Sequence, residues 1–99
     1  MADYRIFATR AYLRDLDRLP AGERASIGRK LDTVVYPALR IEPHAGPSIR
    51  KLVDWRPETW RYRLGEWRCF YEIDEKVRLV LMTSMVRRSE GTDLCADGG

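Results

Sequence analysis

Three arginines and a phenylalanine recur at alternate positions within the stretch 60–73, WRYRLGEWRCFYEI. Each half of this stretch alternates aromatic or aliphatic residues with charged ones, the period of two that is typical of a half-buried strand. Gly65-Glu66 separates the two halves, and glycine at the first central position is typical of a type II′ hairpin turn. The sequence therefore predicts a β-hairpin with Gly65-Glu66 at its tip.

This turn determines the cross-strand register of the predicted hairpin. Leu64 must face Trp67, and Arg63 must then lie opposite Arg68. Residues that lie opposite each other in an antiparallel pair point to the same face of the sheet. The predicted core face carries Trp60, Tyr62, Leu64, Trp67, Cys69, Tyr71 and Ile73, and the other face carries Arg61, Arg63, Arg68, Phe70 and Glu72.

The second face has a composition that suits a polyanion. Like charges directly opposite each other destabilise a strand pair by roughly 0.2–1 kcal/mol, so stability alone does not favour Arg63 opposite Arg68. Guanidinium groups match phosphate oxygens, and an aromatic ring such as Phe70 can stack on an unpaired base. A solvated basic face is the alternative interpretation. We interpret the pattern as an RNA-binding face.

Composition indicates one small domain with a local excess of basic residues. The chain has 99 residues, 44% of them hydrophobic, and a net charge of +3. Residues 48–88 hold ten Lys and Arg against six Asp and Glu, so the excess indicates a site more than a coating. Cys69 and Cys95 form no disulfide framework or metal motif, and we expect no metal and no cofactor. Without a signal peptide or an apolar run of about 20 residues, we expect a cytoplasmic protein and no membrane partner.

The rest of the chain predicts an α+β domain with its helices on one face of the sheet. We expect an amino-terminal strand over 4–8, a helical hairpin, and an antiparallel sheet of three to four strands. Thr9 is the expected cap of the first helix, and Tyr36-Pro37 is expected to weaken or end the second. The expected apolar stripes of the two helices are Tyr12, Leu13, Leu16 and Leu19, then Ile27, Leu31, Val34, Val35 and Ala38.

The last strand, expected over 77–86, is apolar on both faces, which favours a position inside the sheet. The length of the turn before it decides which arginine joins the basic face. A turn of two or four residues adds Arg87, and a turn of three adds Arg88. We expect a single domain over 1–88 and a polar, acidic tail over 89–99.

This arrangement resembles the RelE/ParE superfamily, the toxin halves of bacterial toxin–antitoxin operons. The resemblance rests on the helical hairpin, on Arg50-Lys51-Leu52 as the K-L strand, on residues 60–68 as the R-x-R-x-G-x-[YW]-R element, and on the FYEID run at 70–74. It implies the RelE-like fold, a cytoplasmic location and a cognate antitoxin as partner.

The RelE-like branch of this superfamily is similar to small metal-independent ribonucleases that cleave mRNA on the ribosome. In that branch basic residues of the first hairpin strand, the arginine after Gly-x-aromatic and an arginine ending the last strand surround the scissile phosphate. Matched by position, the expected catalytic residues are Arg61, Arg63, Arg68 and Arg87, and the expected substrate-binding residues are Lys51, Phe70 and Arg88.

Two alternatives stay open beside the endoribonuclease. ParE-like members inhibit DNA gyrase without cutting RNA, and a degenerate member would bind its antitoxin without turnover. The nuclease members usually place His or Tyr a few residues past the last strand, whereas this chain has neither between Arg87 and Asp93. Arginine is not deprotonated at neutral pH, so the arginines alone supply no general base. Asp93 falls near the expected position of the missing residue.

Overall fold

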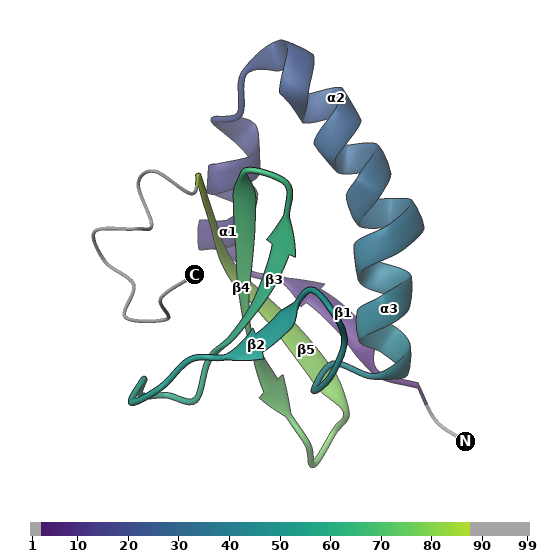
Figure 1. Cartoon of the computed structure of the whole chain (residues 1–99), viewed down its shortest axis with the longest axis vertical. Coiled ribbons are helices and arrows are strands. Elements are labelled where there is room, and N and C mark those ends of the chain that lie inside the picture. Colours follow the sequence, from purple (N-terminus) through teal and green to yellow (C-terminus); the bar gives the residue numbers. More distant parts are fainter. Residues whose placement is uncertain (1–2, 88–99) are drawn as a thin grey trace.

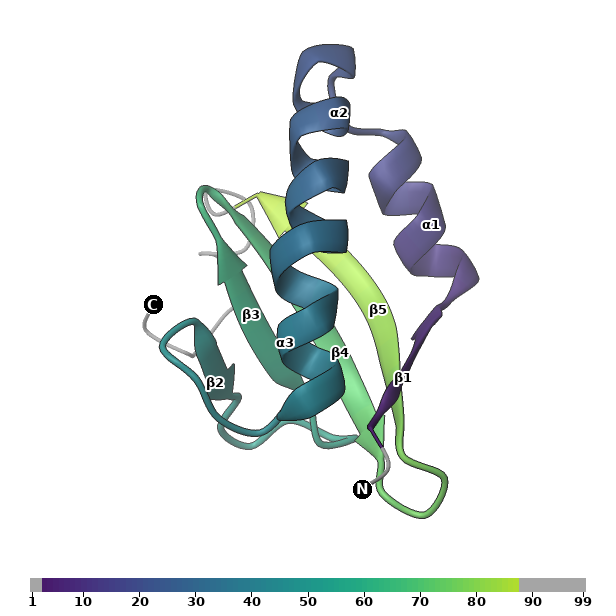
Figure 2. The same cartoon turned by 90° about the vertical axis from the view of Figure 1, so that its right-hand side faces the viewer.

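The computed structural model describes residues 3–87, which form a five-stranded sheet with helices against one face (Figures 1 and 2). The elements in chain order are β1 (Arg5–Ala8), α1 (Arg10–Asp17), α2 (Ala21–Lys30), η1 (Leu31–Val35), α3 (Tyr36–Ile41), β2 (Ile49–Lys51), β3 (Trp60–Leu64), β4 (Trp67–Asp74) and β5 (Leu79–Arg87). The predicted α+β class and the placement of the helices are confirmed. Within the described residues no helix is long and apolar enough to cross a membrane.

The strands lie in the order β1-β5-β4-β3-β2. The pairs β2–β3, β3–β4 and β4–β5 are antiparallel, while β1 runs parallel to β5. The sheet therefore has a fifth, parallel strand beside the antiparallel strands that the sequence predicts. β5 lies between β1 and β4, so the interior position expected from its apolar faces is confirmed.

The first predicted helix begins where the sequence places it. Thr9 caps α1, and its hydroxyl accepts a hydrogen bond from the Tyr12 N–H at 3.3 Å. The second helix continues past Pro37 to Ile41, so of the two expected effects of Tyr36-Pro37, weakening the helix or ending it, the second is wrong. A π-helical turn precedes the proline, and the Tyr36 N–H donates to the carbonyl of Leu31, five residues back. This wider turn shifts the hydrogen bonding where proline, which lacks an N–H, would interrupt an α-helix.

The core fills the space between the helices and the sheet. Figure 2 shows the α2–α3 helix lying across the sheet. Buried residues from both layers form one cluster, which includes Tyr12, Val35, Leu39, Tyr71, Val80 and Met82. The hydroxyl of Tyr71 donates to the carbonyl of Pro43 at 2.7 Å, and those of Tyr12 and Tyr36 lie 2.8 Å apart. Burial raises the pKa of Cys69 to about 12, which keeps this thiol protonated and fits a core role.

The β3–β4 hairpin has the predicted register. Leu64 pairs with Trp67, and Arg63 pairs with Arg68. Gly65 has a φ of +62°, a conformation that glycine adopts at little cost at the first central position of a type II′ turn. The predicted core face is confirmed, because Tyr62, Cys69 and Tyr71 are buried in the cluster and Trp60, Leu64, Trp67 and Ile73 pack against it.

A side-chain cluster ties the loop after α3 to the β4–β5 turn. His44 Nδ1 lies 2.7 Å from the Glu42 carboxylate, and Nε2 contacts the Glu75 carboxylate. The Tyr4 hydroxyl donates to Glu75 at 2.7 Å. Desolvation lowers the pKa of His44, but the hydrogen bonds to Glu75 and Glu42 outweigh it, and the net pKa is raised.

Both carboxyl groups of this cluster have a lowered pKa. For Glu42 the largest cause is the backbone N–H of His44, and for Glu75 it is the Tyr4 hydroxyl, with the imidazole second in each case. A raised folded pKa adds stability that is complete below the unfolded value and is lost as the pH rises through the folded one. A lowered folded pKa adds stability that is lost as the pH falls through it. The cluster therefore stabilises the fold most between the ordinary pKa values of 4.5 and 6.5.

We predict that His44→Gln lowers the stability most between about pH 4.5 and 6.5, where the imidazolium faces two carboxylates. The urea midpoint of both proteins, measured from pH 4 to pH 9, checks this. The difference should shrink as the pH rises through the raised pKa of His44. Lys76→Gln, an exposed change on the same turn, should give an offset that varies less with pH. Parallel midpoint curves for wild type and His44→Gln would contradict the argument.

We also predict that Gly65→Ala destabilises the protein by about 1–2 kcal/mol, the cost of the left-handed conformation for an L-residue. A Cβ at Gly65 would meet no atom within 4 Å, so the effect should come from the backbone alone. Gly28→Ala in α2 is the matched control, since its Cβ also meets nothing within 4 Å and its φ is helical. Alanine there should be neutral or stabilise the helix by up to about 1 kcal/mol. Equal unfolding free energies for both variants would refute the role of the turn.

Candidate functional site

Four arginines lie on the face of the sheet that is turned away from the helices. Arg50 pairs with Arg61 across β2 and β3, and Arg63 pairs with Arg68 across β3 and β4. Cross-strand partners share a face, and the alternate residues of β3 and β4 are in the core. These four residues form the arginine face. The predicted grouping of Arg61, Arg63 and Arg68 is confirmed, and Arg50 is an addition that the sequence analysis missed.

The four side chains differ in exposure. Arg50 and Arg63 are exposed, whereas Arg61 and Arg68 are 5% and 2% exposed. Burying a charged group costs free energy unless it finds partners, and both enclosed arginines make further interactions. Enclosure also restricts the rotamers of a side chain, so the two guanidinium groups are held in place. The face therefore combines two fixed cations with two that solvent can reach.

Phe70 lies on the arginine face but is itself covered. It pairs with Arg61 and is 7% exposed. The indole of Trp55 stacks on it, with ring centroids 5.9 Å apart and an angle of 22° between the planes. The expectation that Phe70 itself is open to a base is therefore wrong, because the loop between β2 and β3 brings Trp55 over it. No pattern in the loop sequence predicts this contact.

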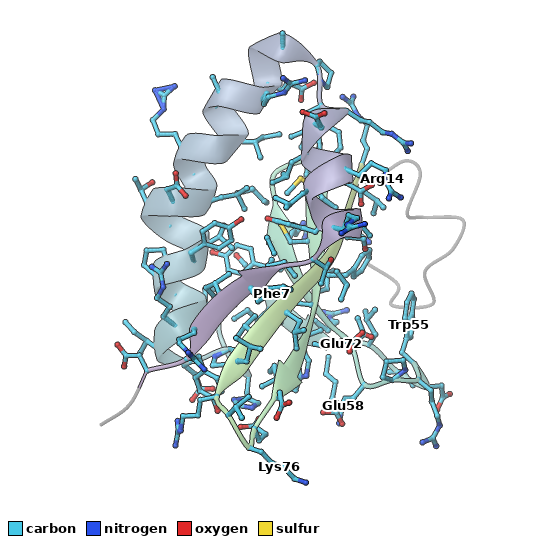
Figure 3. All side chains as sticks on the ribbon, turned by 180° about the vertical axis from the view of Figure 1, so that it is seen from behind. Phe7, Arg14, Trp55, Glu58, Glu72 and Lys76 are labelled. Atoms are coloured by element: carbon cyan, nitrogen blue, oxygen red, sulfur yellow. The ribbon has the colours of Figure 1, made fainter. Side chains whose placement is uncertain are left out.

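Carboxylates border the same side of the sheet. In the view of Figure 3, the labelled side chains of Trp55, Glu58 and Glu72 all lie on the other side of the molecule from the α2–α3 helix. Glu72 is half-buried on β4, two positions beyond Phe70 and therefore on the same face. Glu58 forms an ion pair with Lys51, and 2.8 Å separate the Lys51 Nζ from the Glu58 carboxylate.

Lys51 lies apart from the four arginines. It pairs with Trp60, a residue of the core face, and its Nζ lies 5.9 Å from the centroid of that indole ring. The sequence analysis places Lys51 among the substrate-binding residues by resemblance alone. The β2–β3 register instead turns Arg50 to the arginine face and Lys51 to the side of the helices.

Arg87 also lies on the side of the helices. The turn between Asp74 and Leu79 has the four residues that would bring Arg87 to the arginine face. A β-bulge then intervenes, because Phe70 pairs with Ser84 whereas Tyr71 pairs with Met82. The extra residue reverses the alternation of β5, and Arg87 ends opposite Trp67. The expectation that Arg87 joins the cluster is therefore wrong in position.

At this end of the sheet Arg87 belongs to a contact with α2. Its Nη2 donates to the Glu23 carboxylate at 3.0 Å, and the other oxygen of Glu23 accepts from Trp67 Nε1 at 3.1 Å. The Arg87 guanidinium carbon lies 4.8 Å from the centroid of the Trp67 ring. These contacts fasten the tip of the hairpin and the end of β5 to α2.

Three expectations fall outside the described residues: the substrate-binding role of Arg88, the position of Asp93, and the tail over 89–99. Among residues 3–87 no group of three or more His, Cys, Asp or Glu side chains is arranged to hold a metal ion.

Solved structures of RelE toxins share this fold. The chain is 24% identical to a chain of the RelBE2 toxin–antitoxin complex from Mycobacterium tuberculosis, with a TM-score of 0.67 over 90% of this chain and 95% of that one. It is 21% identical to a chain of the RelE–RelB complex from Pyrococcus horikoshii, with a TM-score of 0.63 over 87% of this chain and 96% of that one. It is 18% identical to the isolated Escherichia coli RelE toxin, with a TM-score of 0.55 over 92% of this chain and 97% of that one. No family model and no curated protein matches the sequence. The expected RelE-like fold is thus confirmed by structure.

We predict that Arg87→Ala lowers the stability and leaves nearly unchanged the RNA binding that the sequence pattern predicts for the arginine face. The ion pair with Glu23 is partly exposed, and such pairs contribute about 0–1 kcal/mol. A double-mutant cycle of Arg87→Ala with Glu23→Gln, measured by urea unfolding, should give a coupling energy in that range. Arg63→Ala, which removes an exposed arginine from the arginine face, is the comparison variant and should weaken RNA binding more than it lowers the stability. The assignment fails if Arg87→Ala abolishes RNA binding without changing the unfolding free energy.

Proposed function

We propose that this chain is the toxin of a type II toxin–antitoxin system and acts as a metal-independent endoribonuclease on mRNA bound to the ribosome. The observation that carries the proposal is the placement of two arginine pairs opposite each other across strands, Arg50 with Arg61 and Arg63 with Arg68, on one face of a continuous sheet. Such pairing weakens a sheet when it serves stability alone, and it suits a polyanionic ligand.

The proposed reaction needs positive charge that is already in place. Attack of a ribose 2′-OH on the adjacent phosphorus forms a bond from phosphorus to the 2′ oxygen and breaks the bond to the 5′ oxygen of the next nucleotide. The 2′-OH loses its proton and the leaving 5′ oxygen takes one up. The reaction passes through a five-coordinate state with extra negative charge on its oxygens. Donors held in place before the reaction stabilise such charge without reorganisation, and the loss of one typically costs about 100- to 1,000-fold in rate. In our proposal Arg50 and Arg63, which solvent can reach, contact the phosphates, and the enclosed Arg61 and Arg68 add fixed positive charge beneath them.

A proton acceptor for the 2′-OH must be another group, because arginine stays protonated at neutral pH. Glu72 is one candidate, since it is half-buried on β4 and shares the arginine face. In this proposal Glu72→Gln lowers the rate of cleavage and leaves RNA affinity unchanged.

A non-catalytic inhibitor of DNA gyrase is the second candidate. Two observations favour it: Arg61 and Arg68 are enclosed, and Arg87 lies on the opposite face. A degenerate toxin that keeps antitoxin binding and has lost turnover is compatible with the same geometry. In each case we propose a cytoplasmic protein with a cognate antitoxin as partner, because RelB–RelE complexes are among the structures to which the chain is similar.

We predict that brief expression of the wild-type chain produces cuts within codons of translated mRNA. Arg68→Ala should reduce the cuts by about 100- to 1,000-fold, because it removes one of the two fixed positive charges of the proposed site. Primer extension on one abundant transcript, after matched induction of each variant, measures this. Arg14→Ala is the control, since it removes an exposed arginine from α1 (Figure 3), and it should cut like wild type.

The other outcomes separate the candidates. An SOS response without mRNA cuts would replace the nuclease by the gyrase inhibitor. An antitoxin complex without either effect would indicate the degenerate toxin. Because Arg68 is buried, Arg63→Ala is a second test that leaves the interior intact, and circular dichroism of each variant confirms folding.

A further inference from the structure

Trp55 is a large aromatic side chain that remains 37% exposed beside the arginine face. One side of its indole stacks on Phe70 and shields that ring from solvent. Leaving apolar surface in water is unfavourable, and tryptophan is the best of the flat side chains for stacking and cation–π contacts. The exposed part of the indole can therefore stack against a ligand that has a flat aromatic face.

We propose that Trp55 is a stacking platform for one unpaired nucleobase of the RNA whose backbone lies on the arginine face. The inference rests on the proposed RNA-binding function and adds to it a subsite for a base. It transfers to Trp55 the stacking role that the sequence pattern suggests for Phe70.

The position of the stack supports this occupant. Phe70 lies directly opposite Arg61, and Arg68 is two positions away on the same strand and face. Trp55 lies over Phe70, so its ring borders the arginine face. A base on Trp55 and its phosphates on the arginines would then contact adjacent parts of the surface. Single-stranded nucleic acids are held in this way, by a basic surface beside aromatic rings.

The nature of the contact defines what the subsite recognises. Every base has a π-face, so stacking tolerates all four bases and requires only that the base be unpaired. Glu58 on the same loop is engaged by Lys51, which reduces its repulsion of a phosphate. The platform should therefore place a single-stranded RNA without reading its sequence.

A cap for Phe70 is the alternative role for Trp55. In that role the indole shields the phenylalanine and never meets a base. Both roles predict a loss of stability when Trp55 is truncated, so stability does not distinguish them. The two roles differ in whether the loss of affinity caused by truncating Trp55 disappears when one particular base is missing from the RNA.

The experiment combines protein variants with abasic RNA. A fluorescent single-stranded RNA of about ten nucleotides, and a set of copies each lacking one base, are titrated with wild type and Trp55→Leu by fluorescence anisotropy. Stacking is worth about 5- to 150-fold in affinity per base, so Trp55→Leu should weaken binding of the intact RNA by that factor. For one abasic copy the two proteins should bind equally, and Trp55→Phe should keep most of the wild-type affinity.

The possible failures are distinguishable. Equal losses for Trp55→Leu on every abasic RNA, or no loss on any, would show that the indole only caps Phe70 and overturn the inference. RNA affinity that depends on Arg63 but not on Trp55 would overturn it and leave the proposed function standing. A wild-type chain that binds none of these free RNAs would overturn the inference, and the proposed function would then be decided by the primer-extension experiment. A Trp55→Leu variant that loses antitoxin binding and keeps RNA affinity would assign the ring to a protein partner, against the proposal.

If Trp55→Leu does not fold, titration of the wild-type chain with the abasic RNAs still tests the stacking platform. Removing the base that stacks on Trp55 should then cost about 5- to 150-fold, more than the removal of its neighbours. A flat profile along the RNA would reject the platform.

Discussion

The structure depends on one constraint, the register of β3 against β4. Side chains alternate between the two faces of a sheet, so a slip of one residue would exchange every residue of one strand between the faces. In β3 such a slip would bring Tyr62 to the arginine face and Arg61 and Arg63 into the core. The reversal at Gly65 prevents this, because a two-residue turn allows Leu64 to meet Trp67 and no other partner. Burial of the core and assembly of the arginine face are therefore consequences of the same turn.

The arginine face lowers the stability of the sheet, and apolar burial on the opposite face offsets this loss. Two arginine pairs repel across neighbouring strands, and Arg61 and Arg68 are enclosed as well. On the other side, Val80 and Met82 are fully buried in the core between the sheet and the helices. Burial of large apolar side chains contributes about 1.5–3 kcal/mol each, which exceeds the repulsion of a cross-strand pair. The sheet can thus hold a cluster of like charges because its other face is packed.

Some features set by local contacts could be predicted from the sequence, and some set by pairing between distant segments could not. The cap at Thr9 and the β3–β4 register depend on residues close together in the chain. The face of Lys51 depends on pairing across the β2–β3 loop, and the face of Arg87 depends on a bulge that alternation alone does not reveal. The helix beyond Pro37 persists through a π-turn, which a rule based on proline alone excludes.

The bulge explains why Arg87 does not join the arginine face as the sequence analysis expects. Without the extra residue in β5, the four-residue turn would turn Arg87 toward the arginine face. With it, Arg87 joins Glu23 and Trp67 and fastens the hairpin tip to α2. This contact holds the turn that aligns Arg63 with Arg68, so Arg87 supports the arginine face from the opposite side of the sheet. The charge available to a ligand is then concentrated on β2, β3 and β4, where the loop that carries Trp55 begins and ends. Binding should therefore depend on the edge of the sheet formed by β2 and its loop more than on the end of β5.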